Sequence, residues 1–241
     1  MLHKKLEEFK GIIDKSNNIV FLGGAGVSTE SGIPDFRSHN GIYNQDYPYP
    51  PERILSASFF KSHTDVFYDF YREKSLKHII KAKPNKAHYK LAELEQKGKL
   101  SAIVTQNIDG LHQASGSKRV LELHGTAHDN YCVKCGETFN LQYIMKTSGI
   151  AHCTCGGMIH PGIVLFEEAL DQNILKESIY HITNADALIV AGTSLVVYPA
   201  AGLLDYYEGH NLILINKDAT GNDGVADLVI HDLVGSVFST I

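Results

Sequence analysis

Short apolar runs and helical spacings alternate along most of the chain. Runs typical of buried strands fall at 19–22, 102–104, 120–123, 187–190, 212–215 and 228–230. Apolar residues three or four positions apart predict helices over 2–15, 58–71, 87–97, 171–183 and 199–207. The regular alternation of strands and helices predicts an α/β fold with a doubly wound, parallel, Rossmann-like sheet.

Two stretches interrupt this alternation. Residues 40–51 are rich in Asn, Gly, Tyr and Pro, which predicts a long loop. Residues 128–162 lose the strand–helix rhythm and contain every cysteine, which predicts a small insert. We therefore expect a main domain formed by residues 1–38, 80–127 and 163–241. Residues 39–79 are expected to form a loop and the helical part of a smaller domain, and residues 128–162 its cysteine-bearing part.

Glycine and polar residues gather where the predicted strands end. They occupy positions 23–26, 106–109, 124, 192–194 and 216–218. In open parallel sheets, ligands bind in the crevice beyond the carboxyl ends of the strands. These strand ends are therefore expected to face one ligand-binding crevice.

A glycine-rich turn, Gly24-Ala25-Gly26, directly follows the first predicted strand. Glycine lets backbone N–H groups approach a phosphate closely, and a helix expected after the turn offers its positive N-terminus. Thr29 stands where the dinucleotide-binding pattern of dehydrogenases requires another glycine. The turn alone therefore fits either a phosphate site or a simple tight turn.

The cysteines form two close pairs, Cys132-x-x-Cys135 and Cys153-x-Cys155. Such pairs are typical of a closed tetrahedral site for structural zinc, and we expect all four to bind one Zn²⁺. The second pair is one residue tighter than usual, so His152 in place of Cys153 is an alternative, as are buried thiols without metal. The insert is short and polar, and zinc is expected to stabilise it directly.

Composition narrows the remaining possibilities. The 241 residues suffice for one large domain with an insert, and no apolar run approaches the ~20 residues of a membrane span. The first residues lack the apolar core of a signal peptide, and clustered thiols suit a reducing compartment, so a cytoplasmic location is expected. The net charge of −5 gives no general attraction to nucleic acid or membranes, and neither is expected as a partner.

One long string makes the glycine-rich turn specific: Gly24-Ala25-Gly26-Val27-Ser28-Thr29-Glu30-Ser31-Gly32-Ile33-Pro34-Asp35-Phe36-Arg37-Ser38. It resembles the sirtuins, whose loop reads G-A-G-x-S-x-x-S-G-I-P-D-F-R. The resemblance continues in family order through residues 105–112 (TQNIDGLH), 123–125 (LHG), the cysteine pairs, 161–166 and 192–201 (GTSLVVYPAA). It covers nearly the whole chain. Sirtuins are NAD-dependent protein-lysine deacylases with a Rossmann-like domain and a structural zinc site.

The resemblance implies a role for each motif. Sirtuins transfer the acyl group of an acyl-lysine to the ADP-ribose of NAD⁺ and release nicotinamide. His124 is implied as the base for a ribose hydroxyl, with Asn107 holding the ribose and a water. Asp109 is implied to accept from the nicotinamide amide, although capping of a helix also suits it. The residues implied for NAD⁺ are Gly24, Ala25, Gly26, Ser28, Ile33, Pro34, Asp35, Phe36, Arg37, Gln106, Asn107, Ile108, Asp109, Gly192, Thr193, Ser194, Asn216, Lys217 and Val234.

Val164, Phe166 and Val196 match the family's substrate loops, where the acyl-lysine peptide is expected to add as a strand. The chain departs from the family nearby. His160-Pro161 replaces Arg-Pro, and Glu167-Glu168 replaces Gly-Glu, which bears on peptide preference rather than on NAD chemistry. Residues 67–73 lack the Tyr-x-x-Arg of desuccinylating relatives, which favours acetyl or longer neutral acyl groups.

Two other functions fit parts of the sequence. A mono-ADP-ribosyltransferase cleaves the same NAD⁺ bond and passes the ribose to a protein nucleophile, but the set Asn107, Asp109 and His124 favours deacylation. A non-catalytic zinc-ribbon module that binds nucleic acid is opposed by the acidic net charge and by the lack of a basic, aromatic stripe.

Overall fold

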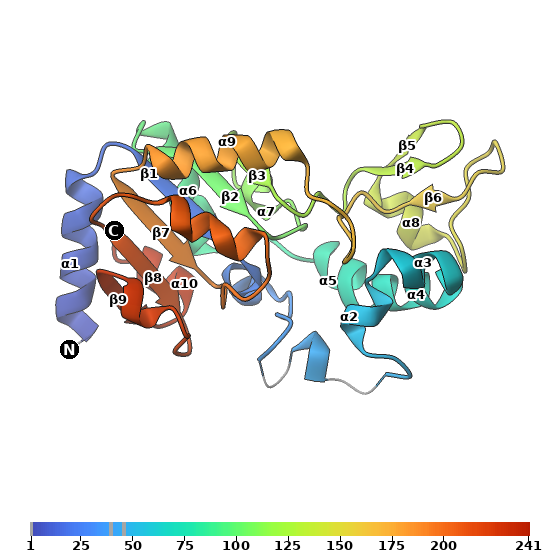
Figure 1. The fold of residues 1–241 in the computed structure, drawn as a ribbon, viewed down its shortest axis with the longest axis horizontal. Coiled ribbons are helices and arrows are strands. Elements are labelled where there is room, and N and C mark those ends of the chain that lie inside the picture. The colour runs from blue at the N-terminus through green and yellow to red at the C-terminus, as the bar shows by residue number, and fades with distance from the viewer. Residues whose placement is uncertain (1, 39–40, 45–46) are drawn as a thin grey trace.

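The computed structural model describes residues 2–38, 41–44 and 47–241, which form a larger and a smaller lobe (Figure 1). The larger lobe contains a six-stranded sheet in which each strand is parallel to its neighbours. Its order, β3-β2-β1-β7-β8-β9, is that of the doubly wound dinucleotide-binding fold. The predicted strands and the predicted fold class are confirmed. The strands are β1 (Ile19–Gly23), β2 (Leu100–Thr105), β3 (Val120–Glu122), β7 (Ala187–Ala191), β8 (Leu212–Asn216) and β9 (Leu228–His231).

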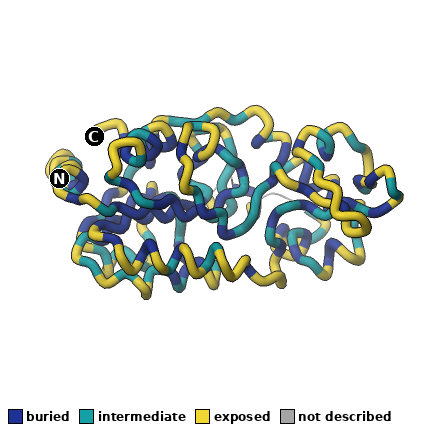
Figure 2. The backbone as a smooth tube through the Cα atoms, turned by 90° about the horizontal axis from the view of Figure 1, so that it is seen from above, coloured by how far each residue is buried: buried dark blue, intermediate teal, exposed yellow. Residues whose placement is uncertain are grey.

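Both faces of this sheet are buried. On β1, Ile19 and Phe21 belong to one apolar cluster, and Val20 and Leu22 belong to another. The first cluster is covered by α1 (Leu2–Lys15), α6 (Lys86–Gln96) and α10 (Val234–Phe238). The second is covered by α9 (Gln172–Thr183) and the 3₁₀ segment η5 (Ala200–Tyr206). Figure 2 shows the resulting buried layer through the middle of the larger lobe, as continuous apolar strands require.

The smaller lobe combines two segments that are distant in sequence. The first gives α2 (Pro51–Ile54), α3 (Ala57–Ser62), α4 (Thr64–Tyr71), the π-helical turn η4 (Arg72–Leu76) and α5 (Lys77–Ile79). The second gives α8 (Leu141–Lys146) and an antiparallel sheet of β4 (Asn130–Cys132), β5 (Thr138–Phe139) and β6 (Ile159–His160). One apolar cluster joins them, and the Tyr68 hydroxyl on α4 donates to the Ile159 carbonyl on β6. The two segments therefore pack as one unit.

Asn85 attaches the glycine-rich turn to a helix of the main sheet. Its side-chain oxygen accepts from the Ala87 N–H (3.0 Å) and caps α6. Its side-chain amide donates to the Val27 carbonyl (2.7 Å) and to Ser31 Oγ (3.0 Å). Because α6 packs on β2, the turn is held against the sheet.

Three helix predictions are wrong in detail. The helix predicted over 58–71 breaks at His63, whose φ of −138° and ψ of 52° separate α3 from α4. The helix predicted over 199–207 is 3₁₀, with Gly202, a poor helix former, inside it. The glycine-rich turn is followed not by an α-helix but by 3₁₀ turns, η1 (Ala25–Val27) and η2 (Thr29–Ser31), because Gly32 leaves the helical region with φ 84°.

Some short elements were not predicted at all. Among them are η3 (Ile42–Asn44), α7 (Leu111–Ala114), η6 (Asp223–Val225), α10 and the helices and strands of the cysteine-bearing insert. The turn η3 lies within the loop predicted over 40–51, of which residues 40, 45 and 46 lie outside the described residues. Helix α10 is only five residues long, and Val234, Val237 and Phe238 are buried in it, so tertiary packing rather than local pattern decides it.

Candidate functional site

A cavity of about 760 Å³ opens beyond the carboxyl ends of the parallel strands. Each of the five predicted strand ends contributes to its wall. The end of β9 adds Asp232, Leu233 and Val234, and the smaller lobe adds Leu55 and Ser75. The volume lies in the range of small-molecule and cofactor sites, so this cavity is the candidate functional site.

Two glycine loops meet in the wall of the cavity. The Gly26 N–H donates to the Gly192 carbonyl (2.8 Å), and Gly192 has a φ of 62°. A Cβ on Gly26 would lie 2.7 Å from Gly192 Cα, and one on Gly192 would lie 2.4 Å from Val27 N. Neither position accepts a side chain without a shift. The glycines therefore let the loop after β1 touch the loop after β7. As a result, backbone atoms rather than side chains line this part of the cavity.

A buried hydrogen-bond network connects three of the predicted site residues. Asn107 Nδ2 donates to Ser28 Oγ (3.1 Å), and Ser28 Oγ donates to Asp109 Oδ2 (2.6 Å). Asp109 Oδ1 accepts from the N–H of Leu111, the first residue of α7 (2.9 Å), while Gly110 takes the N-cap position of this helix. Burial raises the pKa of Asp109, and the hydrogen bonds from Ser28 and Leu111 oppose that rise.

His124 follows β3 and lies beside Gln106. Its Nδ1 is 3.0 Å from the Gln106 carbonyl oxygen. Because a carbonyl only accepts, Nδ1 carries the proton and Nε2 presents a lone pair. Burial lowers the pKa of His124 below its ordinary value, and the Gln106 carbonyl opposes the change. The ring is therefore a neutral base at pH 7. The side chain of Gln106 donates to Thr193 Oγ1 (3.0 Å), linking two strand ends.

The loop after β6, which we call the apolar loop, lines one side of the cavity. The Val164 N–H donates to the His124 carbonyl (2.8 Å), so the loop is tied directly to the histidine's backbone. Val164 and Phe166 lie in the wall, and Phe166 remains 38% exposed. Tyr198, which is 76% exposed, lies in the same wall. Exposed apolar side chains at the wall of a cavity are typical of a binding surface.

The structure brings most predicted site residues to this cavity. Gly24, Ile33, Pro34 and Val196 do not lie in its wall. Ile33 packs instead against the apolar cluster of the smaller lobe, and Val196 is 57% exposed. The predicted residues in the wall are Ala25, Gly26, Ser28, Asp35, Phe36, Arg37, Gln106, Asn107, Ile108, Asp109, His124, Val164, Phe166, Gly192, Thr193, Ser194, Asn216, Lys217 and Val234.

Sequence reasoning missed other residues of the wall. Asp232 and Leu233 follow β9, and the rule applied to the other strand ends could have found them. Tyr198 lies inside the stretch 192–201 that carried the family resemblance. Ser75 belongs to the π-helical turn η4, and no sequence pattern marks it.

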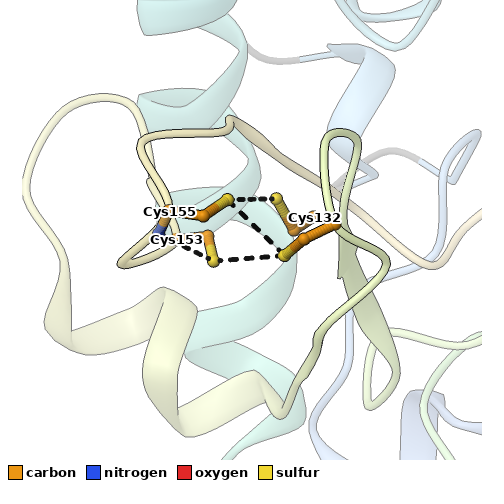
Figure 3. A group of neighbouring side chains, drawn as sticks. Cys132, Cys153 and Cys155 are labelled. Carbon is orange, nitrogen blue, oxygen red and sulfur yellow. Dashed lines mark hydrogen bonds between the residues drawn. The ribbon is translucent and has the colours of Figure 1, made fainter.

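Four thiols meet in the smaller lobe. Figure 3 labels three of them, Cys132, Cys153 and Cys155, whose sulfur atoms point toward one another. Their sulfur atoms all lie within 4.8 Å of one another, with 3.5 Å between Cys132 and Cys155 and 3.6 Å between Cys135 and Cys153. Sulfurs bound to one tetrahedral Zn²⁺ at about 2.3 Å lie roughly 3.8 Å apart, so this set fits zinc. His152 is exposed and does not belong to the cluster.

Comparison with known proteins agrees with this geometry. The chain is 57% identical to an NAD-dependent protein deacetylase of Clostridium acetobutylicum, over 100% of this chain and 99% of that protein. A solved Sir2 histidine-to-alanine variant with a deacetylated p53 peptide and 3′-O-acetyl ADP-ribose is 40% identical, with a TM-score of 0.90 over 98% of this chain and 96% of that one. Sir2Tm bound to a propionylated peptide is 39% identical, with a TM-score of 0.85 over 98% and 96% of the two chains.

A model of the Sir2 family matches residues 24–199. The matched region begins at the glycine-rich turn and includes the Asn107–Ser28–Asp109 network, His124 and the thiol cluster. The chain therefore belongs to the Sir2 family.

Proposed function

We propose that this chain is an NAD-dependent protein-lysine deacetylase, which transfers an acyl group from lysine to ADP-ribose and releases nicotinamide. One observation carries the proposal: a single cavity is lined by His124, the Asn107–Ser28–Asp109 network and the apolar loop of Val164 and Phe166. The name and full-length coverage of the relative at 57% identity support it.

The main-domain segments 1–38, 80–127 and 163–241 bind NAD⁺. The backbone of Ala25 and Gly26 lies in the wall where the two glycine loops meet, and it accommodates the pyrophosphate. Arg37 neutralises that charge, and its guanidinium carbon rests 5.4 Å from the centre of the Tyr43 ring. Ser194 and Asn216 follow β7 and end β8, and they bind a phosphate or the adenosine ribose.

NAD⁺ supplies the acceptor, because loss of nicotinamide leaves an electrophilic ribose carbon for the acyl oxygen. His124 Nε2 takes the proton from a ribose hydroxyl, while the Gln106 carbonyl fixes the ring through Nδ1. Asp109 accepts from the nicotinamide amide, and Ser28 holds its carboxylate in place. Phe36 packs 5.3 Å from Tyr43 between ring centres and keeps water from the reacting carbon.

The acyl-lysine enters along the apolar loop. The peptide adds as a strand at Val164, Phe166 and Val196. Arg72, the cation nearest in sequence to the Tyr-x-x-Arg position, is turned toward α8: it donates to the Ile144 carbonyl (3.0 Å) and to Thr147 Oγ1 (2.8 Å). It does not lie in the cavity wall, which favours neutral acyl groups.

The thiol cluster holds one structural Zn²⁺ through Cys132, Cys135, Cys153 and Cys155. Four thiolates leave no open position on a tetrahedral ion, so zinc supplies stability rather than a reactive water. Within the described residues, no helix is long and apolar enough to cross a membrane. The cytoplasm is the proposed location, because a reducing compartment keeps clustered thiols available for metal.

A panel of acyl-lysine peptides incubated with NAD⁺ tests the function, with product masses read directly. Deacetylation gives nicotinamide and O-acyl-ADP-ribose in equal amounts, with acetyl-lysine turned over faster than succinyl-lysine. ADP-ribosylated protein without O-acyl-ADP-ribose would instead identify a mono-ADP-ribosyltransferase. A DNA band shift with a steep salt dependence and no NAD⁺ turnover would favour the nucleic-acid-binding alternative.

A further inference from the structure

The apolar loop is attached to the helical segment of the smaller lobe through its backbone. The Phe166 N–H donates to the Leu55 carbonyl (3.0 Å), and the Ala57 N–H donates to the Phe166 carbonyl (3.0 Å). Together they form a parallel bridge between Phe166 and Ser56. The loop therefore runs as a short strand beside residues 55–57.

Glu167 follows this bridge in a conformation that favours glycine. Its φ of 77° is in the left-handed region, where a side chain carries an energetic cost that glycine avoids. The Glu167 carboxylate accepts from the Ser58 N–H through Oε2 (2.9 Å) and from Ser58 Oγ through Oε1 (3.0 Å). Both carboxylate oxygens are therefore engaged in the first turn of α3, which offsets the cost of the backbone conformation.

The neighbouring Glu168 has different partners. Its Oε2 accepts from the Leu165 N–H (2.8 Å), and its Oε1 lies 3.4 Å from His160 Nε2 on β6. The two successive carboxylates thus have separate partners: Glu167 bonds to the helical segment, whereas Glu168 bonds within the loop and lies beside His160. Of the two, only Glu167 adopts the left-handed backbone.

We propose that Glu167 is a positioning residue that clamps the loop to Ser58 and thereby fixes the position of Phe166, beside which the acyl-lysine peptide is bound. The proposal rests on the proposed function, since it assigns a peptide to this loop. The hydrogen bonds from Ser58 hold both carboxylate oxygens but leave the charge of the carboxylate in place, so selection of peptides by charge is the competing role of Glu167. The clamp orders the loop equally for peptides with basic and acidic neighbours of the acyl-lysine.

Steady-state kinetics of Glu167→Gly, Glu167→Gln, Ser58→Ala and the double variant Ser58→Ala/Glu167→Gly test this clamp. Ser62→Ala is the matched control, because Ser62 is on the same helix and its Oγ bonds to the Ser58 carbonyl rather than to the loop. Glu167→Gly is expected to raise the KM for an acetyl-lysine peptide about fivefold, because it removes the two hydrogen bonds between the Glu167 carboxylate and Ser58. The KM for NAD⁺ and kcat stay unchanged. Glu167→Gln keeps one acceptor oxygen, so its KM for the peptide is expected to lie between those of the wild type and Glu167→Gly.

The double variant and peptides of different charge distinguish a positioning role of Glu167 from selection of peptides by charge. A clamp predicts that the double variant raises the peptide KM no further than Glu167→Gly alone, since both changes break the same contact. It also predicts equal shifts for peptides with Arg and with Asp beside the acetyl-lysine. Additive effects, an unchanged peptide KM in Glu167→Gly, or a shift confined to the Arg peptide would each overturn the positioning role.

Amide hydrogen exchange tests the clamp without turnover. Glu167→Gly is expected to speed exchange at the Phe166 and Ala57 amides about fivefold, and Ser62→Ala is not. Unchanged exchange at both amides overturns the clamp. Faster exchange in a protein that turns over no acyl-lysine peptide would contradict the proposed function alone.

Discussion

The strand-end cavity and the thiol cluster are held in place by different means. In the cavity, polar groups bind one another: Asn107, Ser28 and Asp109 are hydrogen-bonded in sequence, and His124 rests on the Gln106 carbonyl. The elements beneath them belong to a six-stranded sheet buried on both faces. The thiol cluster lies instead among strands of two or three residues, with four like groups within 4.8 Å.

This difference separates activity from stability. Folding of the sheet prepares the cavity, so its side chains can be changed while the fold remains. Four neutral thiols attract one another only weakly, and the proposed Zn²⁺ would supply the free energy that orders the short strands around them. Changes in the cavity are therefore expected to alter turnover first, and changes in the cluster to alter stability first.

Replacing the base is expected to have the largest effect. His124→Ala removes proton transfer and should lower kcat by about 10²- to 10⁴-fold, the usual contribution of a general base. The unfolding temperature should stay near that of the wild type, because the sheet beneath His124 is unchanged. His210→Ala, an exposed histidine, is the control. Nicotinamide release and circular dichroism measure the two effects, and full activity in His124→Ala would refute its role as base.

Loss of one thiol is expected to lower stability first and turnover second. Cys135→Ser removes one of the four proposed zinc ligands and should destabilise the chain by about 3 kcal/mol or more, because structural zinc contributes directly to folding. Activity then falls as the smaller lobe loosens. Thermal unfolding and zinc content are measured together, with Ser148→Ala in the same insert as control. A zinc-free protein with unchanged unfolding temperature and turnover would contradict the comparison.

Acid is expected to act on the larger lobe through two buried histidines. His88 and His112 are at most 1% exposed, and their ring centres lie 4.7 Å apart. No residue that the structure describes hydrogen-bonds to either ring nitrogen of His112. Burial lowers both pKa values, that of His88 to about 4 and that of His112 with a further contribution from His88. Both rings are therefore neutral in the folded protein at pH 7.

The sign of the pH effect follows from the unfolded chain, whose histidines take up protons near pH 6.5. The stability that the two neutral rings contribute is fully present well above pH 6.5 and falls as the pH drops toward 4, by at most about 1.4 kcal/mol per pH unit for each histidine. Urea unfolding at pH 7.5, 6.5 and 5.5 measures this slope. His88→Leu should flatten it, because leucine takes up no proton in the unfolded chain. Equal stability at the three pH values would show that these rings are not the acid-sensitive groups.

The sequence patterns predicted the sheet better than the segments between its strands. Continuous apolar runs mark strands buried on both faces, so all six could be found. The spacing of the cysteines likewise marked the cluster. The break at His63 and the 3₁₀ form of η5 depend on packing against distant elements, and local spacing carries no record of them.

The cavity shows the same limit. Strand ends indicated where His124, Asn107 and Asn216 would meet, because parallel strands deliver their carboxyl ends to one edge. The close approach of Gly26 to Gly192 and the contribution of Ser75 arise from segments far apart in the chain. Glu167 was noted as a departure from the family's glycine, but only the structure reveals its bonds to Ser58.

The smallest expected effect sharpens the comparison within the cavity. Ser28 is 1% exposed and stands between Asn107 and Asp109, so Ser28→Ala leaves the Asp109 Oδ2 without its donor and the Asn107 amide without its acceptor. Cavity water can partly replace the hydroxyl, and we expect about a tenfold fall in kcat/KM for NAD⁺. Ser101→Ala, on β2 of the same sheet, is the control. If Ser28→Ala lowered the unfolding temperature as much as Cys135→Ser while sparing kcat/KM, the cavity would depend on its polar network for folding, and the contrast between the two regions would fail.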